Sequence, residues 1–190
     1  MDSNALLKFL SVAEKLKCNL RHSWTSSMRQ ESVAEHSWRL CVFAWLMGRE
    51  FPGYDMDRVL LMCLFHDLGE ALTGDVPAFL KTERHENEEA DAIGRILDML
   101  DEPARKELSG LFTEMREQKT KEAKLFKALD KLEAVIQHNE APTESWIPLE
   151  YELNLTYGDE EVKHSAVLQE LREEIRKITV QIIELRRGAG

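Results

Sequence analysis

The first candidates for chemistry in this sequence are ionisable residues that interrupt apolar segments. His66 and Asp67 directly follow the apolar run 59–65, and Glu70 comes one helical turn after His66. Burying an imidazole and a carboxylate side by side costs free energy unless a partner compensates both groups. On one continuous helix the three side chains would share a sector. A bound metal ion would compensate them.

Two more ionisable residues lie in segments that otherwise resemble core. His36 precedes the apolar positions of segment 40–46, and Asp130 interrupts the apolar segment 125–132. Two imidazoles and two carboxylates from three helices suit a divalent transition metal with open positions for water. The residues alone leave a second interpretation open, in which they are separate hydrogen-bonded side chains at helix ends. Glu133 is either a partner of such a ligand or a surface glutamate.

The elements that must position these residues are helices. Apolar residues recur at helical spacing and no segment shows sustained alternation, so we predict an all-α bundle. Ser32 and Glu35 form a capping box, and Asp55 caps the next helix. Segment 141–159 is predicted as a long ordered connection. The predicted helices number about seven and span roughly residues 4–17, 32–50, 55–70, 82–100, from 103, 121–139 and 160–187.

Length and composition predict a single domain. The 190 residues, 43% of them hydrophobic, are enough for one sizeable core, and no linker divides them. We expect one domain over 1–190, with a core at about 5–140 and a C-terminal connection and helix at 141–187. Trp38 and Trp45 are expected to pack in the core. The wide apolar stripe of the last helix predicts a homodimer.

Charge and hydropathy restrict the partners. The net charge of −10 argues against a nucleic-acid polymer, because duplex binding draws its affinity from clustered Lys and Arg. No apolar run is long enough to cross a bilayer, and the first ten residues lack a secretory signal pattern. We therefore expect a cytoplasmic protein that does not associate with membranes and acts on a small molecule.

The order and spacing of His36, the His66-Asp67 pair and Asp130 resemble the H...HD...D signature of the HD-domain phosphohydrolase superfamily. The surrounding sequence strengthens the resemblance and is similar to the branch that contains bacterial 5'-deoxynucleotidases and related eukaryotic HD-domain proteins. The matching features are Arg21 and the segments Glu31 to Ser37 (ESVAEHS), His66 to Glu70 (HDLGE) and Thr73 to Pro77 (TGDVP). The resemblance implies a single-domain HD-type helical bundle.

The resemblance also implies a metal-dependent phosphoric monoester hydrolase. The substrates implied are (deoxy)ribonucleoside 5'-monophosphates, which are attacked by metal-bound water. A divalent cation lowers the pKa of bound water and polarises a phosphoryl oxygen. One ion is expected, and Co, Mn, Ni, Zn, Fe and Mg all remain candidates. The implied metal ligands are His36, His66, Asp67 and Asp130.

Further residues receive roles from the same resemblance. Glu70 is the implied acid/base residue, and Asp75 is implied to contact substrate or to position the nucleophile. Arg21 is implied to hold the phosphate or the sugar, through the paired donors of its guanidinium. The branch carries a tryptophan directly after this arginine, whereas His22 follows here and the tryptophan comes at Trp24. Both residues are candidate sugar contacts, so selection for deoxyribose stays open.

Two alternatives remain beside the 5'-nucleotidase. The first is an HD hydrolase of another phosphate ester, such as a nucleoside triphosphate or a cyclic dinucleotide. The second is a non-catalytic module that binds a metal ion or a nucleotide.

Overall fold

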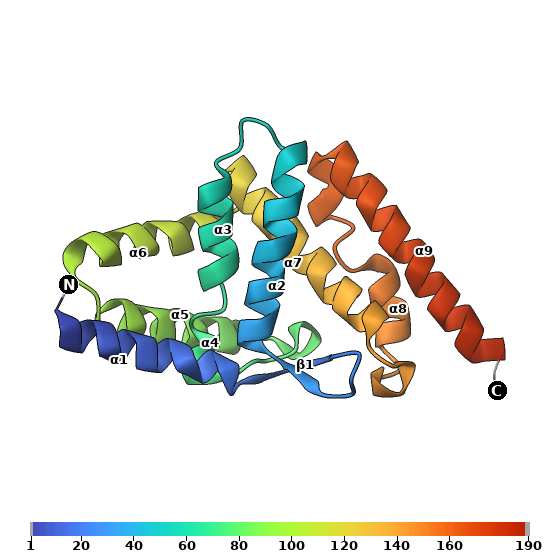
Figure 1. Ribbon diagram of the computed structural model, residues 1–190, viewed down its shortest axis with the longest axis horizontal. Helices are drawn as coiled ribbons and strands as arrows, with labels where there is room; N and C mark the ends of the chain where they lie inside the picture. The colour runs from blue at the N-terminus through green and yellow to red at the C-terminus, as the bar shows by residue number, and fades with distance from the viewer. Residues whose placement is uncertain (1, 189–190) are drawn as a thin grey trace.

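Each of the seven predicted helices is present in the computed structural model, which describes residues 2–188 (Figure 1). The all-α fold is therefore confirmed. The long helices are α1 (Ser3–Glu14), α2 (Val33–Met47), α3 (Met56–Phe65), α5 (Glu83–Leu97), α6 (Glu102–Glu117), α7 (Lys121–Glu140) and α9 (Ala166–Gly188). Two short helices are α4 (Glu70–Thr73) and α8 (Glu150–Thr156). The 3-10 turns are η1 (Lys15–Lys17), η2 (Gly48–Glu50), η3 (Ala78–Leu80), η4 (Thr143–Ser145) and η5 (Glu161–His164).

Local capping fixes where α2 and α3 begin. The Ser32 hydroxyl accepts a hydrogen bond from the Glu35 amide at 3.2 Å, and the Glu35 carboxylate accepts one from the Ser32 amide at 2.8 Å. This reciprocal pair is the predicted capping box. Asp55 accepts a hydrogen bond from the Arg58 amide at 3.1 Å. The first cap places His36 in the first turn of α2.

A β-hairpin between α1 and α2 was not predicted from the sequence. Strand β1 (Leu20–Trp24) pairs antiparallel with β2 (Gln30–Ser32), with Leu20 opposite Ser32, Trp24 opposite Gln30 and an irregularity in between. The strands have five and three residues, which is too short for an alternating pattern to be visible. The hairpin packs on α7 and carries Arg21 and His22.

The predicted continuous helix from Asp55 to Glu70 is wrong. Helix α3 ends at Phe65, a turn occupies residues 66–69, and α4 begins at Glu70. The turn lies close against α5, because a Cβ added at Gly69 would lie 2.8 Å from Cγ of Glu89. The shared helical sector that the spacing suggests therefore does not exist, and the turn itself presents Asp67.

The C-terminal segment contains α8 where the sequence predicts only a connection. Its seven residues are too few for a helical period to be recognised. Helix α9 packs against α7 and α8 (Figure 1). From α9, the buried Arg172 donates a hydrogen bond to the backbone oxygen of Asn154 at 3.0 Å. The last helix therefore holds α8 in place.

The centre of the fold is the group α2, α3 and α7, which pack against one another. Their buried faces supply most of the main apolar cluster, to which Leu168 and Ile175 of α9 also belong. The prediction that Trp38 and Trp45 pack in the core is wrong, since they are 68% and 60% exposed. Helix α2 is apolar on two faces: Leu40 and Ala44 are buried in the core, whereas Trp38 and Trp45 are exposed to solvent.

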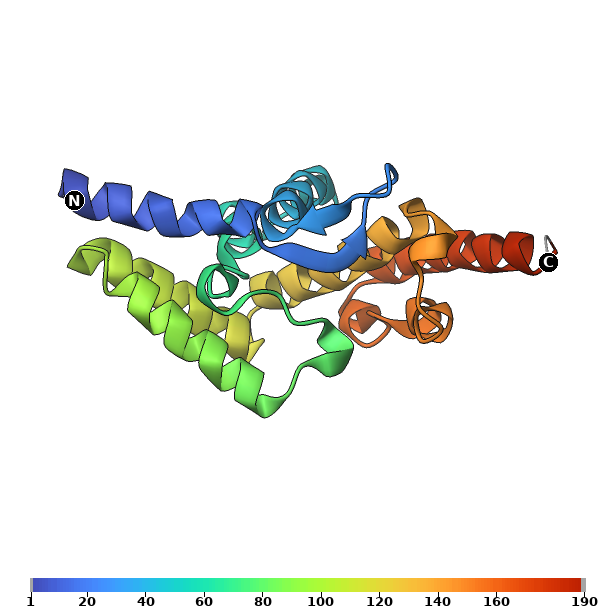
Figure 2. The ribbon, with the colours of Figure 1, turned by 90° about the horizontal axis from the view of Figure 1, so that it is seen from below.

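Figure 2 shows the N-terminus on α1 and the C-terminal end of α9 at opposite ends of the molecule. Among the helices of residues 2–188, none combines the length and the apolar character needed to cross a lipid bilayer.

Candidate metal centre

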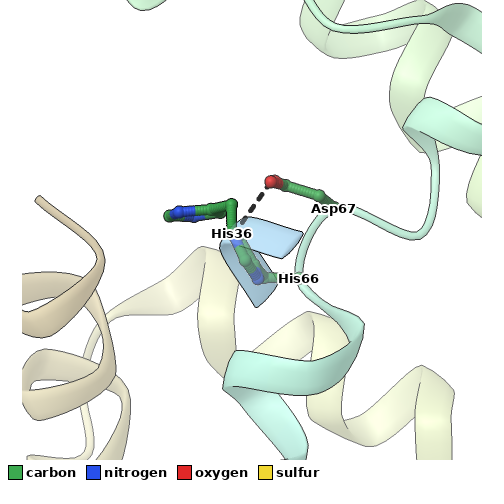
Figure 3. Close-up of side chains that lie close together, drawn as sticks. All are labelled: His36, His66 and Asp67. Atoms are coloured by element: carbon green, nitrogen blue, oxygen red, sulfur yellow. Dashed lines mark ion pairs between the residues drawn. The ribbon is translucent and has the colours of Figure 1, made fainter. Parts of the chain in front are cut away.

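The four ligands predicted from the sequence converge at one point, which we call the metal centre. His36 comes from the first turn of α2 and Asp130 from the middle of α7. His66 caps the C-terminus of α3, and Asp67 follows it in the turn. His66 Nε2 lies 3.0 Å from Asp67 Oδ2 and 3.7 Å from Asp130 Oδ1. His36 Nε2 lies 3.3 Å from Asp130 Oδ1. Figure 3 shows both imidazoles beside Asp67. One ligand atom from each of these three residues lies within 4.8 Å of the others.

The hydrogen bonds of the two imidazoles favour a cation at this point. His66 Nδ1 donates to the backbone oxygen of Cys63 at 3.0 Å, so its Nε2 is left as the acceptor in the neutral ring. This Nε2 is buried and has no hydrogen-bond partner within residues 2–188, although it faces two carboxylates. A lone pair that faces carboxylate oxygens is repelled unless a positive charge lies between them. Two histidine nitrogens and two carboxylates are also a suitable donor set for a divalent transition metal.

Electrostatics at the centre favour positive charge. Burial raises the pKa of Asp130, but Lys127, His36 and His66 outweigh it and hold this pKa well below the usual range. Burial also opposes ionisation of Asp67, whereas positive charge at the position of His66, which a bound cation would supply beside a neutral ring, lowers its pKa. Lys127 Nζ lies 2.9 Å from Oδ2 of Asp130. The other oxygen of Asp130 is the one that faces the imidazoles.

Glu133 positions His36 through Nδ1, the imidazole nitrogen that does not face Asp130. Its Oε2 accepts a hydrogen bond from His36 Nδ1 at 2.5 Å, and the side chain is 1% exposed. Arg39 Nε lies 3.6 Å from the second oxygen of Glu133. Arg39 also donates to Gln137 Oε1 at 2.6 Å. A carboxylate on the outer nitrogen fixes the tautomer of a metal-binding histidine, so the structure identifies Glu133 as the partner of a predicted ligand.

Glu70 lies in a second group of carboxylates beside the centre. Single oxygens of Asp67, Glu70 and Glu89 lie within 4.8 Å of one another. Burial, followed by the charges of Asp67 and Asp75, raises the pKa of Glu70 far above its ordinary value. Lys81 neutralises Glu89, with Nζ 2.6 Å from the carboxylate. Burial and the neighbouring carboxylates therefore favour the protonated form of Glu70.

Arg21, His22 and Asp75 lie together in a cavity of about 80 Å³, which we call the Arg21 cavity. Nη1 of Arg21 is buried and lacks a hydrogen-bond acceptor among the described residues, while its Nε lies 3.7 Å from Glu31 Oε2. Burial lowers the pKa of Arg21, but Glu31, Asp67 and other carboxylates raise it above its ordinary value. The other polar and aromatic residues that line the cavity include Phe79, His138, Glu150 and Asn154.

Trp24 does not line the Arg21 cavity. Its backbone oxygen accepts a hydrogen bond from Gln137 Nε2 at 2.7 Å, which links the hairpin to α7. Lys127 was not predicted as part of the site, although a lysine one helical turn before Asp130 is in the right position to form an ion pair with it. Glu150 and Asn154 carry no such signal, because only the packing of α8 brings them to the cavity.

The sequence matches the family described as HD domain over residues 13–172, a range that includes the metal centre. This chain belongs to the HD-domain family. The resemblance to HD-domain proteins that the sequence analysis described is thereby confirmed. HD domains are metal-dependent, which agrees with the donor set of the metal centre.

Curated relatives of this HD domain are 5'-deoxynucleotidases. Human 5'-deoxynucleotidase HDDC2 is 36% identical over 143 residues, which cover 73% of this chain and 69% of the human protein. Its counterpart from Dictyostelium discoideum is 33% identical over 141 residues, covering 69% of this chain and 74% of that protein.

Solved structures share the HD-domain fold. A protein from Magnetospirillum magnetotacticum, described as a predicted metal-dependent phosphohydrolase, has a TM-score of 0.79 at 24% identity, covering 94% of this chain and 93% of that one. At this identity the likeness shows the fold alone. A conserved hypothetical protein from Pyrococcus furiosus has a TM-score of 0.69 at 29% identity, covering 90% of this chain and 99% of that one.

Proposed function

We propose that this HD domain is a metal-dependent 5'-nucleotidase that hydrolyses (deoxy)ribonucleoside 5'-monophosphates. The observation that carries the proposal is the convergence of two histidine Nε2 atoms and two carboxylates beside the buried donor of Arg21. The curated relatives support the substrate class. One divalent ion would be held, with Co, Mn, Ni, Zn, Fe and Mg as candidates.

The metal ligands would be His36, His66, Asp67 and Asp130. When bound there, a divalent cation lowers the pKa of water and polarises a phosphoryl oxygen. Glu133 and the backbone oxygen of Cys63 hold the two imidazoles with Nε2 directed at the carboxylates. Because these two hydrogen bonds fix the orientations of the rings, little side-chain freedom is left to lose on metal binding.

Arg21 would bind the phosphate. A guanidinium offers paired donors to a phosphate dianion, and such charge-assisted hydrogen bonds are among the stronger ones in proteins. Glu31 pairs with Arg21 through Nε, which leaves the buried Nη1 available for the phosphate. The positive charge of Arg21 also offsets the repulsion that a protein of net charge −10 exerts on an anionic substrate.

Glu70 and Asp75 would handle protons and positioning. Hydrolysis of a phosphate monoester removes a proton from the attacking water and adds one to the departing 5'-oxygen. Glu70, whose protonated form burial and the neighbouring carboxylates favour, is suited to donate to the departing oxygen. Asp75 lines the Arg21 cavity, where it would orient the substrate. His22 would contact the sugar from the same cavity, while Trp24 stays a prediction for that role.

The decisive experiment is an assay of phosphate release from a panel of nucleoside 5'-monophosphates, with each candidate metal added to metal-free protein. We expect release with at least one metal and no release by Asp67→Ala. No release by the native protein with any metal would contradict the proposal. Release of triphosphate from nucleoside triphosphates, or of linear products from cyclic dinucleotides, would instead favour another HD hydrolase. Tight nucleotide binding without turnover would favour a non-catalytic module.

We further propose that the protein is a homodimer, formed through an exposed apolar stripe on α2. The stripe consists of Trp38, Val42, Trp45 and Leu46. An apolar patch of this kind on a small domain is typical of an interaction surface, and a two-fold dimer would cover the same patch on both copies. The α9 stripe that motivates the dimer in the sequence is divided, because Leu171 and Ile175 pack on the core while Ile178 and Leu185 are exposed. A sedimentation mass near 22 kDa would contradict the dimer.

The cytoplasmic location stays a prediction.

A further inference from the structure

The Arg21 cavity contains polar side chains that the HD signature does not include. Asn154 of α8 is 3% exposed, and its Nδ2 has no hydrogen-bond acceptor in the described part of the chain. Buried amide groups are almost always hydrogen-bonded, because leaving one unpaired costs free energy. The unpaired amide lines a cavity, so a ligand atom is its natural partner.

Glu150, one turn before Asn154 on α8, is fixed next to it. Its Oε2 accepts a hydrogen bond from the Ile147 amide at 2.8 Å. Its Oε1 lies 3.0 Å from His22 Nε2 and 3.3 Å from His138 Nδ1. The cavity is therefore lined by an acceptor on Glu150, which these contacts hold in place, and by the buried donor of Asn154 one helical turn away. A hydroxyl group can both donate and accept, so it matches the pair.

The order of the groups in a nucleoside 5'-monophosphate indicates which part of the substrate would reach Glu150 and Asn154. Arg21 lines the same cavity and has a buried donor of its own without an acceptor. In a nucleoside 5'-monophosphate a single methylene separates the phosphate from the pentose. With the phosphate on Arg21, the pentose is the next group to enter the cavity.

The size and walls of the cavity agree with a pentose. A volume of about 80 Å³ corresponds to roughly six water positions, which suits a five-membered ring better than a purine. Phe79 supplies an apolar wall, with its ring centroid 5.5 Å from that of His22. Hydroxyl groups on one edge of the sugar and C–H groups on the other would then each meet a suitable surface.

We propose that Asn154 and Glu150 form a pentose subsite, in which Asn154 Nδ2 donates to the substrate's 3'-hydroxyl and Glu150 accepts from it. Deoxyribo- and ribonucleotides share this hydroxyl group. The inference rests on the proposed function, since it names the residues that would recognise the sugar of that substrate. Both residues are specificity determinants, because the metal centre lies on other elements.

The test compares a 2'-deoxynucleoside 5'-monophosphate with its 2',3'-dideoxy analogue, which lacks the 3'-hydroxyl. We expect the native protein to hydrolyse the deoxynucleotide with about tenfold higher kcat/KM, because without the 3'-hydroxyl Asn154 Nδ2 loses its acceptor, whereas Glu150 Oε1 keeps His22 and His138 as neighbours. Asn154→Leu should lower kcat/KM for the deoxynucleotide by about tenfold and leave the dideoxynucleotide almost unchanged. Asn154→Asp, of nearly the same shape, should also lose the preference because the donor is gone. Glu152→Leu, an exposed change on α8, is the matched control and should keep the preference.

The outcomes separate this inference from the proposed function. A native protein that hydrolyses both nucleotides equally well overturns the subsite and leaves the function in place. An equal loss on both nucleotides in Asn154→Leu and Asn154→Asp overturns the subsite in favour of a structural role. Calorimetric binding of the deoxynucleoside and dideoxynucleoside, which carry no phosphate, needs no turnover. If no nucleotide is hydrolysed but the deoxynucleoside binds more tightly and Asn154→Leu removes that preference, the function is overturned and the subsite is supported.

Discussion

The metal centre and the Arg21 cavity are neighbours, but they are built in different ways. The residues of the metal centre come from α2, α7 and the end of α3, which pack together in the core, and Nδ1 of both imidazoles already has a partner. The cavity is bounded by a hairpin, the loop after α4, one side of α7 and the short helix α8, and within the described residues Arg21 and Asn154 keep donors without an acceptor. Under the proposed function, an ion would complete the first site and a substrate the second.

The largest effect is expected from breaking the metal centre. Asp67→Ala should remove one ligand and lower phosphate release by more than about 100-fold, because even changes behind the ligands cost about 10- to 100-fold. The measurement is initial rate together with metal content after dialysis. Asp57→Ala, an exposed change on α3, is the control. Full activity and metal content in Asp67→Ala would place the ion elsewhere.

As the pH falls, the protein should lose stability first through His138, which lines the Arg21 cavity, and only at more acidic pH through the carboxylates of the metal centre. Burial and the charges of His22 and Arg21 lower the pKa of His138 to about 4, against 6.5 in the unfolded chain. As pH falls from 6.5 to 4, only the unfolded state takes up this proton, so the free energy of unfolding should fall, by at most about 3 kcal/mol. The carboxylates Asp67 and Asp130, whose pKa values are lowered, lose their contribution only at more acidic pH.

The measurement for this prediction is urea unfolding between pH 7 and 4 for the native protein and His138→Asn. In His138→Asn the free energy of unfolding should fall less steeply with decreasing pH than in the native protein. Comparing the two proteins is necessary because Glu31, whose pKa burial raises to about 7, acts in the opposite direction. Identical slopes would show that His138 is not the group responsible.

A smaller effect is expected from replacing the carboxylate of Glu133, which accepts a hydrogen bond from His36 Nδ1. Glu133→Gln keeps the shape but weakens the hydrogen bond that orients the imidazole, so metal affinity should fall about 10- to 100-fold. Competition with a chelator measures this affinity. Glu140→Gln, on the same helix and next to the same Arg39, does not contact His36 and should leave affinity unchanged. An equal loss in both variants would indicate a general effect on α7.

The smallest effect is expected from a change in phosphate binding that keeps the charge. Arg21→Lys retains the positive charge but loses the paired donors, so KM for nucleotides should rise about tenfold. Metal affinity should not change, which separates this cavity from the metal centre. Arg29→Lys, exposed on the same hairpin, is the control. A lower metal affinity in Arg21→Lys would contradict the division between the two sites.

The predicted elements agree with the structure where a signal is local and repeated. The capping box of Ser32 and Glu35 and the seven long helices are of this kind. The hairpin and α8 are too short to repeat a pattern, and the break after Phe65 depends on how closely Gly69 approaches α5. Those features follow from packing between segments that are distant in the sequence.

By itself, the sequence determined the fold class and the family, because helical periodicity and the ordered HD motif depend on residue type and spacing alone. The four metal ligands stay a prediction from that motif. Tertiary structure alone decided that Glu133 faces His36, that Trp38 is exposed, and that Asn154 reaches the Arg21 cavity. The physical reason is that a partner contributed by a distant helix depends on how the helices pack. Residue type and local spacing carry no record of that packing.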